Sequence, residues 1–501
     1  MFLLPLLLLL GVALIIFRIY ARHKLNYWRR RGVEQLASSD SIFGDFKDAV
    51  LFRTAPGWHL GHLHKSSPNK DAPMLGFYIF HKPCLLLRDP ELIKQVMIRD
   101  FENFSDRHFA GSQQKDSIGM KNLFGLKNPA WKYVRSKITP TLTRGKLKQM
   151  LPLMMQTGEP MLEYLKTLLK EAEIDGEGKG SKLVDAQELN YKYTTDLIAN
   201  VALGTPMDSF HHPNEEFTKA VYQFFHGFKR MVALVTVFFV PELVELIGPS
   251  MLFNSSFVRK VFWNAVDTRE KTGEKRGDFI DSLIQLKNGE QNPEYKFEGE
   301  NLLYQSGTFF SGFESSSTTT SFTLMEIAAH PEVQQRARKD IERAIKEHGM
   351  TYEAFNDMKY LDQCIAEGVR LHPPVSTIDR YTRLDYKFPG TDIVIEKGTP
   401  IYISLYGMQE DPRFFERPEV FDPERFADDK SISDAYIPFG IGPRMCVGMK
   451  VGQLHAKVVL ALILRNYIVT QRPENKLVLD PRSTFTAAAD GINLVFQKIS
   501  E

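Results

Sequence analysis

The sequence predicts a mainly α-helical fold with a minor β part, in which one large domain follows an N-terminal membrane anchor. Three observations predict it. The amino terminus is apolar and uncharged, helical patterns run through most of the chain, and short β-branched runs lie near residues 384–405. We expect a transmembrane anchor at residues 1–20, a basic juxtamembrane linker at 21–55 that leads into the body, and the folded domain at 56–501.

Composition narrows the possible functions. The 501 residues include 63 Lys and Arg against 61 Asp and Glu, and the net charge of +2 gives no reason to expect nucleic-acid binding. Hydrophobic residues make up 43% of the chain, which excludes a disordered protein. The three cysteines, Cys84, Cys364 and Cys446, are too few for a disulfide scaffold or a multi-cysteine metal site. A cysteine that does chemistry here must act alone.

The anchor is predicted from an uncharged run between Met1 and Phe17, which is the short end of the range for a spanning helix. A basic stretch without any acidic residue follows it: Arg18, Arg22, Lys24, Arg29, Arg30 and Arg31. Positive charge stays on the cytoplasmic side, so the body should face the cytosol. A cleaved signal peptide is the alternative, but the charges follow the apolar run and no small-x-small cleavage site is evident.

The body is predicted as one domain of helices with few strands. Residues 171–183 and 285–297 are rich in Gly, Asn or charge and indicate surface loops. The stretch from Gly299 to about Ala329 lacks proline and predicts one long helix, and Pro331 opens another that ends at Gly349. The apolar segment from Met231 to Val240 is too short to span a bilayer. It predicts a buried helix, with a second membrane contact as the alternative.

A cysteine loop carries the strongest motif. Residues 439–448 fit F-x-x-G-x-R-x-C-x-G, with Phe439, Gly442, Arg444, Cys446 and Gly448 at the fixed positions. A lone structural cysteine would not explain the other four. The loop resembles that of the cytochromes P450, the haem-thiolate monooxygenases. This resemblance implies haem b with the Cys446 thiolate as iron ligand, Phe439 shielding the sulfur, and Arg444 pairing with a haem propionate. The two glycines would let the backbone approach the flat macrocycle.

Further stretches resemble the same family in the expected order. Glu367 and Arg370 form E-x-x-R on one helix face, and the resemblance adds Arg425 to this pair as a structural triad that fixes the cysteine loop. Trp131 and Arg135 form W-x-x-x-R, one helical turn apart, and would reach the propionates. The family often carries further propionate-binding arginines. Two positions of this chain match them: Arg107 and Arg380.

Residues 311–316 resemble the family's oxygen-side motif, [AG]-G-x-[DE]-T-[TS]. The resemblance implies that Gly312 leaves space for O2, while the acid Glu314 and the hydroxyl of Ser315 supply protons. Two positions depart from the pattern, because Ser311 replaces a small apolar residue and Ser315 replaces threonine. Ser315 keeps the hydroxyl but lacks the methyl group that restricts χ1, which predicts more leakage to peroxide.

The reaction implied is insertion of one oxygen atom of O2 into a lipophilic small molecule. Electrons would come from NADPH through a membrane-bound P450 reductase, with cytochrome b5 as a candidate second donor. The enzyme would lie in the endoplasmic reticulum membrane with its catalytic domain facing the cytosol. Segments 139–143 and 278–284 and the anchor resemble insect family-six microsomal members. Alternatives are a haem-thiolate isomerase or dehydratase that needs no O2, and a non-catalytic haem-binding membrane protein.

Side-chain roles outside the motifs stay open. The mostly apolar or small segments 106–126, 225–240, 309–315, 375–379 and 484–488 are candidate substrate contacts. They do not separate a xenobiotic or an insecticide from a hormone-like substrate. Four lysines are candidates for a reductase-docking face: Lys132, Lys137, Lys450 and Lys457. The histidines His59, His62 and His64 have zinc-like spacing but no carboxylate or cysteine nearby, so we do not predict a metal site there.

Overall fold

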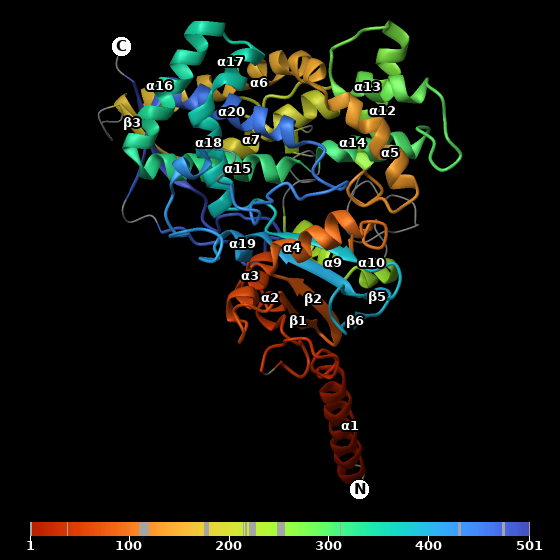
Figure 1. Cartoon of the computed structure of the whole chain (residues 1–501). Coiled ribbons are helices and arrows are strands. Elements are labelled where there is room, and N and C mark those ends of the chain that lie inside the picture. Colours follow the sequence, from red (N-terminus) through yellow and green to blue (C-terminus); the bar gives the residue numbers. More distant parts are fainter. Residues whose placement is uncertain are drawn as a thin grey trace.

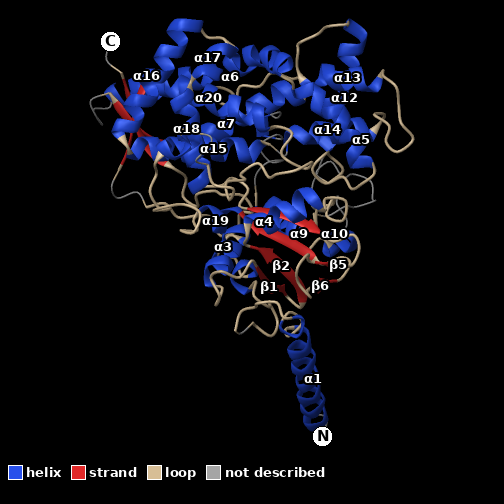
Figure 2. Ribbon diagram, in the orientation of Figure 1, coloured by secondary structure: helices blue, strands red, loops and turns tan. Residues whose placement is uncertain are grey.

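The computed structural model describes residues 3–37, 39–109, 120–174, 180–213, 215, 218–219, 227–247, 256–310, 312–428, 432–472 and 476–499. Most of the body is helical, and the strands β1 (Met74–Ile79), β2 (Lys82–Leu87), β5 (Tyr386–Lys387) and β6 (Val394–Ile395) lie near the end from which the N-terminal helix projects (Figure 1). Figure 2 shows further strands, with β3 (Ser181–Asp185) among them, at the far end beside the helices. The predicted class, mainly α with a minor β part, is confirmed.

The helices and strands have the following bounds. The first helices are α1 (Leu3–Lys24), α2 (Lys47–Val50), α3 (Pro56–Ser66), α4 (Pro90–Lys94), α5 (Ala130–Ile138), α6 (Arg144–Ile174), α7 (Ala186–Ala202), α9 (Phe228–Phe239) and α10 (Glu242–Ile247). The later helices are α12 (Ser256–Thr272), α13 (Phe279–Lys287), α14 (Glu300–Phe310), α15 (Phe313–Ala329), α16 (Pro331–His348), α17 (Tyr352–Asp357), α18 (Lys359–Leu371), α19 (Leu405–Gln409) and α20 (Met449–Asn466). The strands are β1 (Met74–Ile79), β2 (Lys82–Leu87), β3 (Ser181–Asp185), β4 (Thr377–Tyr381), β5 (Tyr386–Lys387), β6 (Val394–Ile395), β7 (Pro400–Ser404), β8 (Tyr467–Gln471) and β9 (Asn493–Lys498).

The largest sheet joins segments that lie far apart in the sequence. Its strand order is β1-β2-β7-β4, with β7 parallel to β2 and antiparallel to its other neighbour, β4. Strand β4 therefore lies at one edge, where it holds Asp379 opposite Tyr402 and Arg380 opposite Ile401. A second sheet pairs β3 with β9 and β9 with β8, so the last strand of the chain closes against its middle.

Helix α15 lies at the centre of the helical part, where it packs against α7, α18 and α20. Its sequence is rich in Ser and Thr, yet Ser317, Thr320 and Ser321 are fully buried. Burial is possible because the hydroxyl groups donate hydrogen bonds back to helix carbonyls, for example from Ser321 to Ser317 at 2.7 Å. The helix thus combines a polar sequence with a core position.

Several sequence predictions need correction. The long helix from Gly299 to Ala329 is two helices, because α14 ends at Phe310 and α15 begins at Phe313. The predicted loop 171–183 is partly regular, since α6 continues to Ile174 and β3 begins at Ser181. The strands near 384–405 are confirmed as β5, β6 and β7. So are the helix over Met231–Val240, which is α9, and the Pro331 helix, which Gly349 ends at a φ of 68°.

Helix α1 projects away from the body, and its last turns contact the turn between β1 and β2 (Figure 1). The rings of Phe17 and Tyr20 lie 5.7 and 5.4 Å from the ring of His81. None of the helices within the described ranges combines the length and hydropathy that a membrane crossing requires. The anchor at residues 1–20 and the domain boundaries at 21–55 and 56–501 stay predictions.

Candidate active site

Cys446 lies in a closed loop just before α20. The backbone N–H of Cys446 donates to the carbonyl of Phe439 at 2.9 Å, and that of Met445 donates to Gly442 at 2.9 Å. Gly442 has a φ of 74°, and a Cβ there would come within 2.2 Å of the Met97 carbonyl oxygen. In the structure, therefore, this glycine lets the loop pack against the backbone of residues 95–99. That the glycine also clears space for a macrocycle stays a prediction.

Cys446 is exposed although its thiol lies within the protein. Desolvation by the surrounding atoms raises the pKa of this thiol. The backbone N–H of Gly448 and the guanidinium groups of Arg135 and Arg107 act in the opposite direction and favour the thiolate. Residue Cys446 is therefore partly open to solvent, while its thiol is desolvated and lies near two guanidinium groups.

The five predicted propionate-binding residues gather around this loop. Arg444 is buried and donates to the carbonyl of Leu126 at 2.7 Å and to the Asp106 carboxylate at 3.3 Å. Its guanidinium lies over the ring of Trp131, 4.2 Å from the centroid. Trp131 is itself buried. Its ring packs against the guanidinium of Arg444, in addition to the propionate contact predicted for it. Arg135, one turn further along α5, is close enough to Cys446 to influence its pKa.

Arg107 and Arg380 both contact Asp379, one through its carboxylate and the other through its backbone carbonyl. Arg107 pairs with Asp379 at 3.2 Å, and its guanidinium lies 4.0 Å from the centroid of the Phe124 ring. Arg380 is buried on β4, and its guanidinium donates to the carbonyl of Asp379 at 2.6 Å. Burial first, and then repulsion from Arg107 and Arg444, lowers the pKa of Arg380 well below its ordinary value. Arginine does not deprotonate in proteins, so this lowering indicates a demand for negative charge.

The charges around Cys446 do not balance. Cations outnumber carboxylates. The cations are Arg107, Lys127, Arg135, Arg380, Arg444 and, 3.9 Å from Asp106, Arg383; the carboxylates are Asp106 and Asp379. Among the described residues, the Nε atoms of Arg107, Arg380 and Arg444 are buried without a hydrogen-bond partner. The two propionates of a haem would supply negative charge to these arginines. The residues present therefore fit the cofactor that the sequence implies.

Sequence reasoning missed three residues of this cluster: Asp106, Lys127 and Asp379. A signal existed for the two carboxylates, because each directly precedes a predicted arginine, in Asp106-Arg107 and Asp379-Arg380. In the folded chain, Arg107 pairs with Asp379, whereas Asp106 accepts a hydrogen bond from Arg444. Lys127 carries no motif, and its place in the cluster becomes visible only in three dimensions.

The predicted structural triad is assembled as expected. Glu367 and Arg370 are fully buried and share two hydrogen bonds of 2.6 and 2.8 Å, and Arg425 reaches the same carboxylate at 3.2 Å. Arg370 also donates to the carbonyls of Gln409, Pro418 and Val420. The segment before the cysteine loop is tied to the same helix, because the Tyr436 hydroxyl donates to the Ala366 carbonyl at 3.0 Å. The triad thus fixes α18 to the chain that leads to Cys446.

The oxygen-side residues lie at the break between α14 and α15. Gly312 forms this break, and its carbonyl accepts hydrogen bonds from the Ser316 backbone at 3.1 Å and from the Ser315 hydroxyl at 3.1 Å. Glu314 and Ser315 are half-buried in the first turn of α15, which packs against α20. Ser311 lies outside the described residues. The roles of Gly312, Glu314 and Ser315 in oxygen chemistry stay predictions.

Two side predictions can be compared with the structure. Lys457 is buried and binds Asp362 at 2.8 Å, so it does not belong to an exposed docking face, whereas Lys132 and Lys450 are exposed. His59 and His64 have separate partners, the carbonyl of Asp45 and the carboxylate of Asp411. The two histidines therefore bind different groups and do not point to a common ligand.

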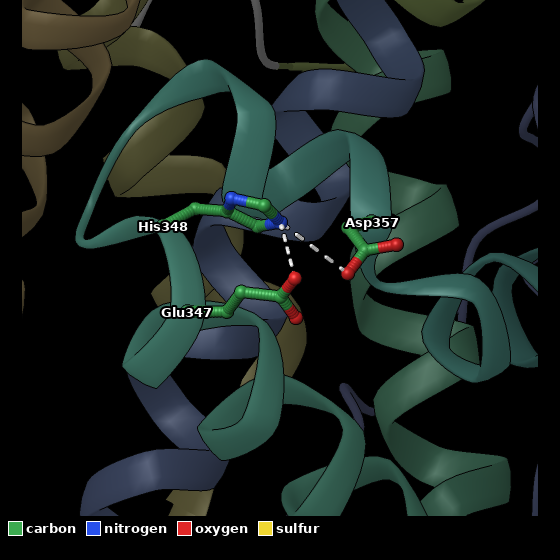
Figure 3. A group of neighbouring side chains, drawn as sticks. All are labelled: Glu347, His348 and Asp357. Carbon is green, nitrogen blue, oxygen red and sulfur yellow. Dashed lines mark ion pairs between the residues drawn. The ribbon is translucent and has the colours of Figure 1, made fainter.

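A different group of potential metal ligands lies at the protein surface (Figure 3). His348 is 3.8 Å from Glu347 and 3.6 Å from Asp357, and the three side chains converge. Arg343 already pairs with both carboxylates, at 2.6 Å for Asp357 and 3.6 Å for Glu347. The group therefore belongs to a surface ion-pair network centred on Arg343, which also binds Asp340 at 3.0 Å.

Known proteins agree with this site. The cytochrome P450 family model matches residues 52–495. Cytochrome P450 6k1 of Blattella germanica is 35% identical over 98% of this chain and 97% of its own length. The probable cytochrome P450 6g2 of Drosophila melanogaster is 35% identical over 94% of each chain. Since this similarity extends over the whole body and includes the cysteine loop, the chain belongs to the cytochrome P450 family, the haem-thiolate monooxygenases, and is similar to insect members of its family six.

Proposed function

We propose that the protein inserts one oxygen atom of O2 into a lipophilic small molecule, with electrons from NADPH that a P450 reductase delivers. Cytochrome b5 is a second candidate donor. The observation that carries the haem part of this proposal is the excess of arginine and lysine side chains over carboxylates near the Cys446 thiol. A bound haem supplies the oxygen-activating chemistry, which thiolate ligation favours.

The residues of the chain have separate tasks in this proposal. Cys446 binds the iron through its sulfur, and the Gly448 N–H and the guanidinium of Arg135 stabilise the negative charge on that sulfur. Arg107, Arg380 and Arg444 orient the cofactor through its carboxylates. Glu314 and the Ser315 hydroxyl, in the first turn of α15, would hold protons and pass them from solvent to the reaction site.

An aromatic cluster supports a lipophilic substrate. Phe109, Phe124 and Phe238 contact one another, with ring centroids 4.9 to 5.8 Å apart, and Phe485 joins at 6.3 Å from Phe238. These four rings come from three segments that the sequence analysis named as candidate substrate contacts. Arg107 lies against Phe124, so the cluster borders the cationic end of the proposed haem site. Apolar, aromatic walls of this kind favour a hydrophobic ligand.

The proposed function has a direct spectroscopic test. The reduced protein under carbon monoxide should show the strongly red-shifted Soret band of a thiolate-ligated haem. With a P450 reductase and a lipophilic substrate, NADPH consumption should then depend on O2 and yield a hydroxylated product. Haem without the red-shifted band would contradict thiolate ligation. A red-shifted band together with product formation in the absence of O2 would favour the isomerase or dehydratase alternative.

Exchange of Ser315 for threonine should improve coupling. The serine hydroxyl donates to the Gly312 carbonyl, and the added methyl group would restrict rotation about χ1. We expect Ser315→Thr to lower the hydrogen peroxide formed per NADPH by at least about twofold. Peroxide and NADPH are measured in the same reaction. Ser316→Thr adds the same methyl group one residue along and should leave the ratio unchanged. An unchanged ratio in Ser315→Thr would refute the idea.

We also propose that α1 attaches the enzyme to the endoplasmic reticulum membrane, with the catalytic domain facing the cytosol. Its described apolar side chains support this, because Val12, Leu14, Ile15, Ile16 and Ile19 are between 52% and 66% exposed. Deletion of residues 1–20 should move most of the protein from the carbonate-washed membrane pellet to the supernatant. In sealed microsomes, the domain of the full chain should be open to added protease. A protected domain would reverse the proposed orientation.

A further inference from the structure

Lys127 holds the backbone of the segment that carries Arg107. Its ammonium group donates a hydrogen bond to the carbonyl of Phe109 at 2.8 Å and a second one to the carbonyl of Arg107. These two carbonyls flank His108, so one side chain fixes both ends of the turn. Lys127 is only partly exposed, although it lies just before α5 and close to the exposed Pro129.

The same segment is held from the opposite side by Asp379. This carboxylate accepts from the backbone N–H of Phe109 at 3.1 Å and from the guanidinium of Arg107 at 3.2 Å. The backbone N–H of Asn128, next to Lys127, donates to Asp106 at 2.9 Å. Residues 106–109 therefore lie between β4 and the approach to α5. Lys127 is the cation that links their carbonyls to this approach.

Charged side chains from several neighbouring segments surround Lys127. Burial lowers the pKa of Lys127 to about 8, Asp379 and Asp106 oppose this change, and Arg444 and Arg107 add to it. The ring of Tyr381 on β4 lies 5.4 Å from the ammonium group. Burial raises the pKa of this tyrosine, so its hydroxyl stays neutral. Lys127 thus carries a charge at neutral pH and loses it as the pH rises.

We propose that Lys127 is a positioning residue that keeps Arg107 directed toward the haem propionates and thereby slows haem release. This inference rests on the proposed haem site. Arg107 has a long, flexible side chain, and its direction depends on where its own backbone is held. Without the ammonium group, the carbonyls of Arg107 and Phe109 lose a charged donor, and the cluster loses one of its cations. Both effects weaken the hold on an anionic cofactor edge.

The experiment measures haem transfer from the holoenzyme to excess apomyoglobin. Lys127→Met keeps the length of the side chain but removes the ammonium group, and we expect release to become roughly tenfold faster. Lys127→Arg restores a charged donor and should return the rate to near the wild-type value. Lys132→Met, at an exposed lysine at the start of α5, is the matched control and should not change the rate. Lys127→Gln serves the same purpose as Lys127→Met if the latter does not fold.

A merely structural role would give a different pattern. In that case the thermal unfolding midpoint of the helices would fall together with haem retention, and Lys127→Arg, which changes the shape, would not restore it. We expect the unfolding midpoint of Lys127→Met to stay close to wild type while release accelerates. A wild-type release rate in Lys127→Met, or no rescue by Lys127→Arg, overturns the inference.

The pH dependence gives an independent readout. The bound propionates favour the charged form of Lys127, so its charge is present at neutral pH and is lost at or above pH 8. Wild-type release should therefore accelerate on the alkaline side, whereas Lys127→Arg, which stays charged, should show less acceleration. Equal pH profiles contradict the proposal. If the wild-type protein binds no haem, the proposed function also falls; if it binds haem and only the Lys127 results are negative, this inference alone falls.

Discussion

Cys446→Ser will abolish the red-shifted carbon monoxide band and reduce substrate oxidation to background. The structure offers no replacement for this sulfur, because Cys84 and Cys364 are buried and burial raises the pKa of both thiols, for Cys84 to about 12. The reactive species is the thiolate, and neither buried thiol forms one at neutral pH. The reduced spectrum under carbon monoxide is measured together with total haem content.

This pair of measurements separates loss of the ligand from loss of the cofactor. If serine leaves haem bound, the Soret band should lie where haems without a thiolate ligand have it. Cys84→Ala, which removes a buried sulfur from β2, should keep the red-shifted band. A red-shifted band that persists in Cys446→Ser would mean that another group ligates the iron, and the assignment of the site would be wrong.

Glu367→Gln should destabilise the fold far more than removal of an exposed carboxylate. The side chain stays the same size, but the two guanidinium groups of Arg370 and Arg425 lose the carboxylate between them. Breaking a buried ion pair in this way costs about 3–5 kcal/mol in the free energy of unfolding. We expect such a loss in urea unfolding of the purified protein, with a lower haem content because the segment leading to Cys446 loosens.

A surface carboxylate with two cationic partners provides the control. Glu353 binds Arg144 at 3.4 Å and also contacts Lys148, but it is exposed and its charges are screened by water. Glu353→Gln should change the free energy of unfolding far less than Glu367→Gln. If the two variants unfold alike, the buried triad is not what fixes α18, and the role predicted from the motif would be wrong.

Motif residues were predictable because their spacing is local. Glu367 and Arg370 are three residues apart on one helix, so their contact follows from helix geometry. The partners of Asp379 were not predictable in this way, since Arg107 lies 272 positions away and only the sheet brings it near. Lys457 shows the same limit, because its helix is buried on almost every side and no local pattern indicates that this lysine lies inside.

Strand β2 and the break at Gly312 were missed for different physical reasons. Residues 82–87 read KPCLLL, without the alternation of a half-exposed strand, because the last four of them are buried on both faces. A leucine run of this length is equally compatible with a helix. At residues 311–312 no proline marks the break. A single glycine inside a helix lowers helix stability by only about 1 kcal/mol relative to alanine. Tertiary packing therefore decides whether the helix continues or ends there.

The strand order β1-β2-β7-β4 also determines when this sheet can form during synthesis of the chain. The edge of β2 that pairs with β7 waits for residues 401–403, which follow it by roughly 300 positions. At about 5–20 residues per second, a ribosome needs roughly 15–60 s to make that stretch. For this time the hairpin of β1 and β2 presents an open apolar edge. The edge of β2 therefore stays unpaired until the last fifth of the chain is being made, and Cys446 is made only after that point.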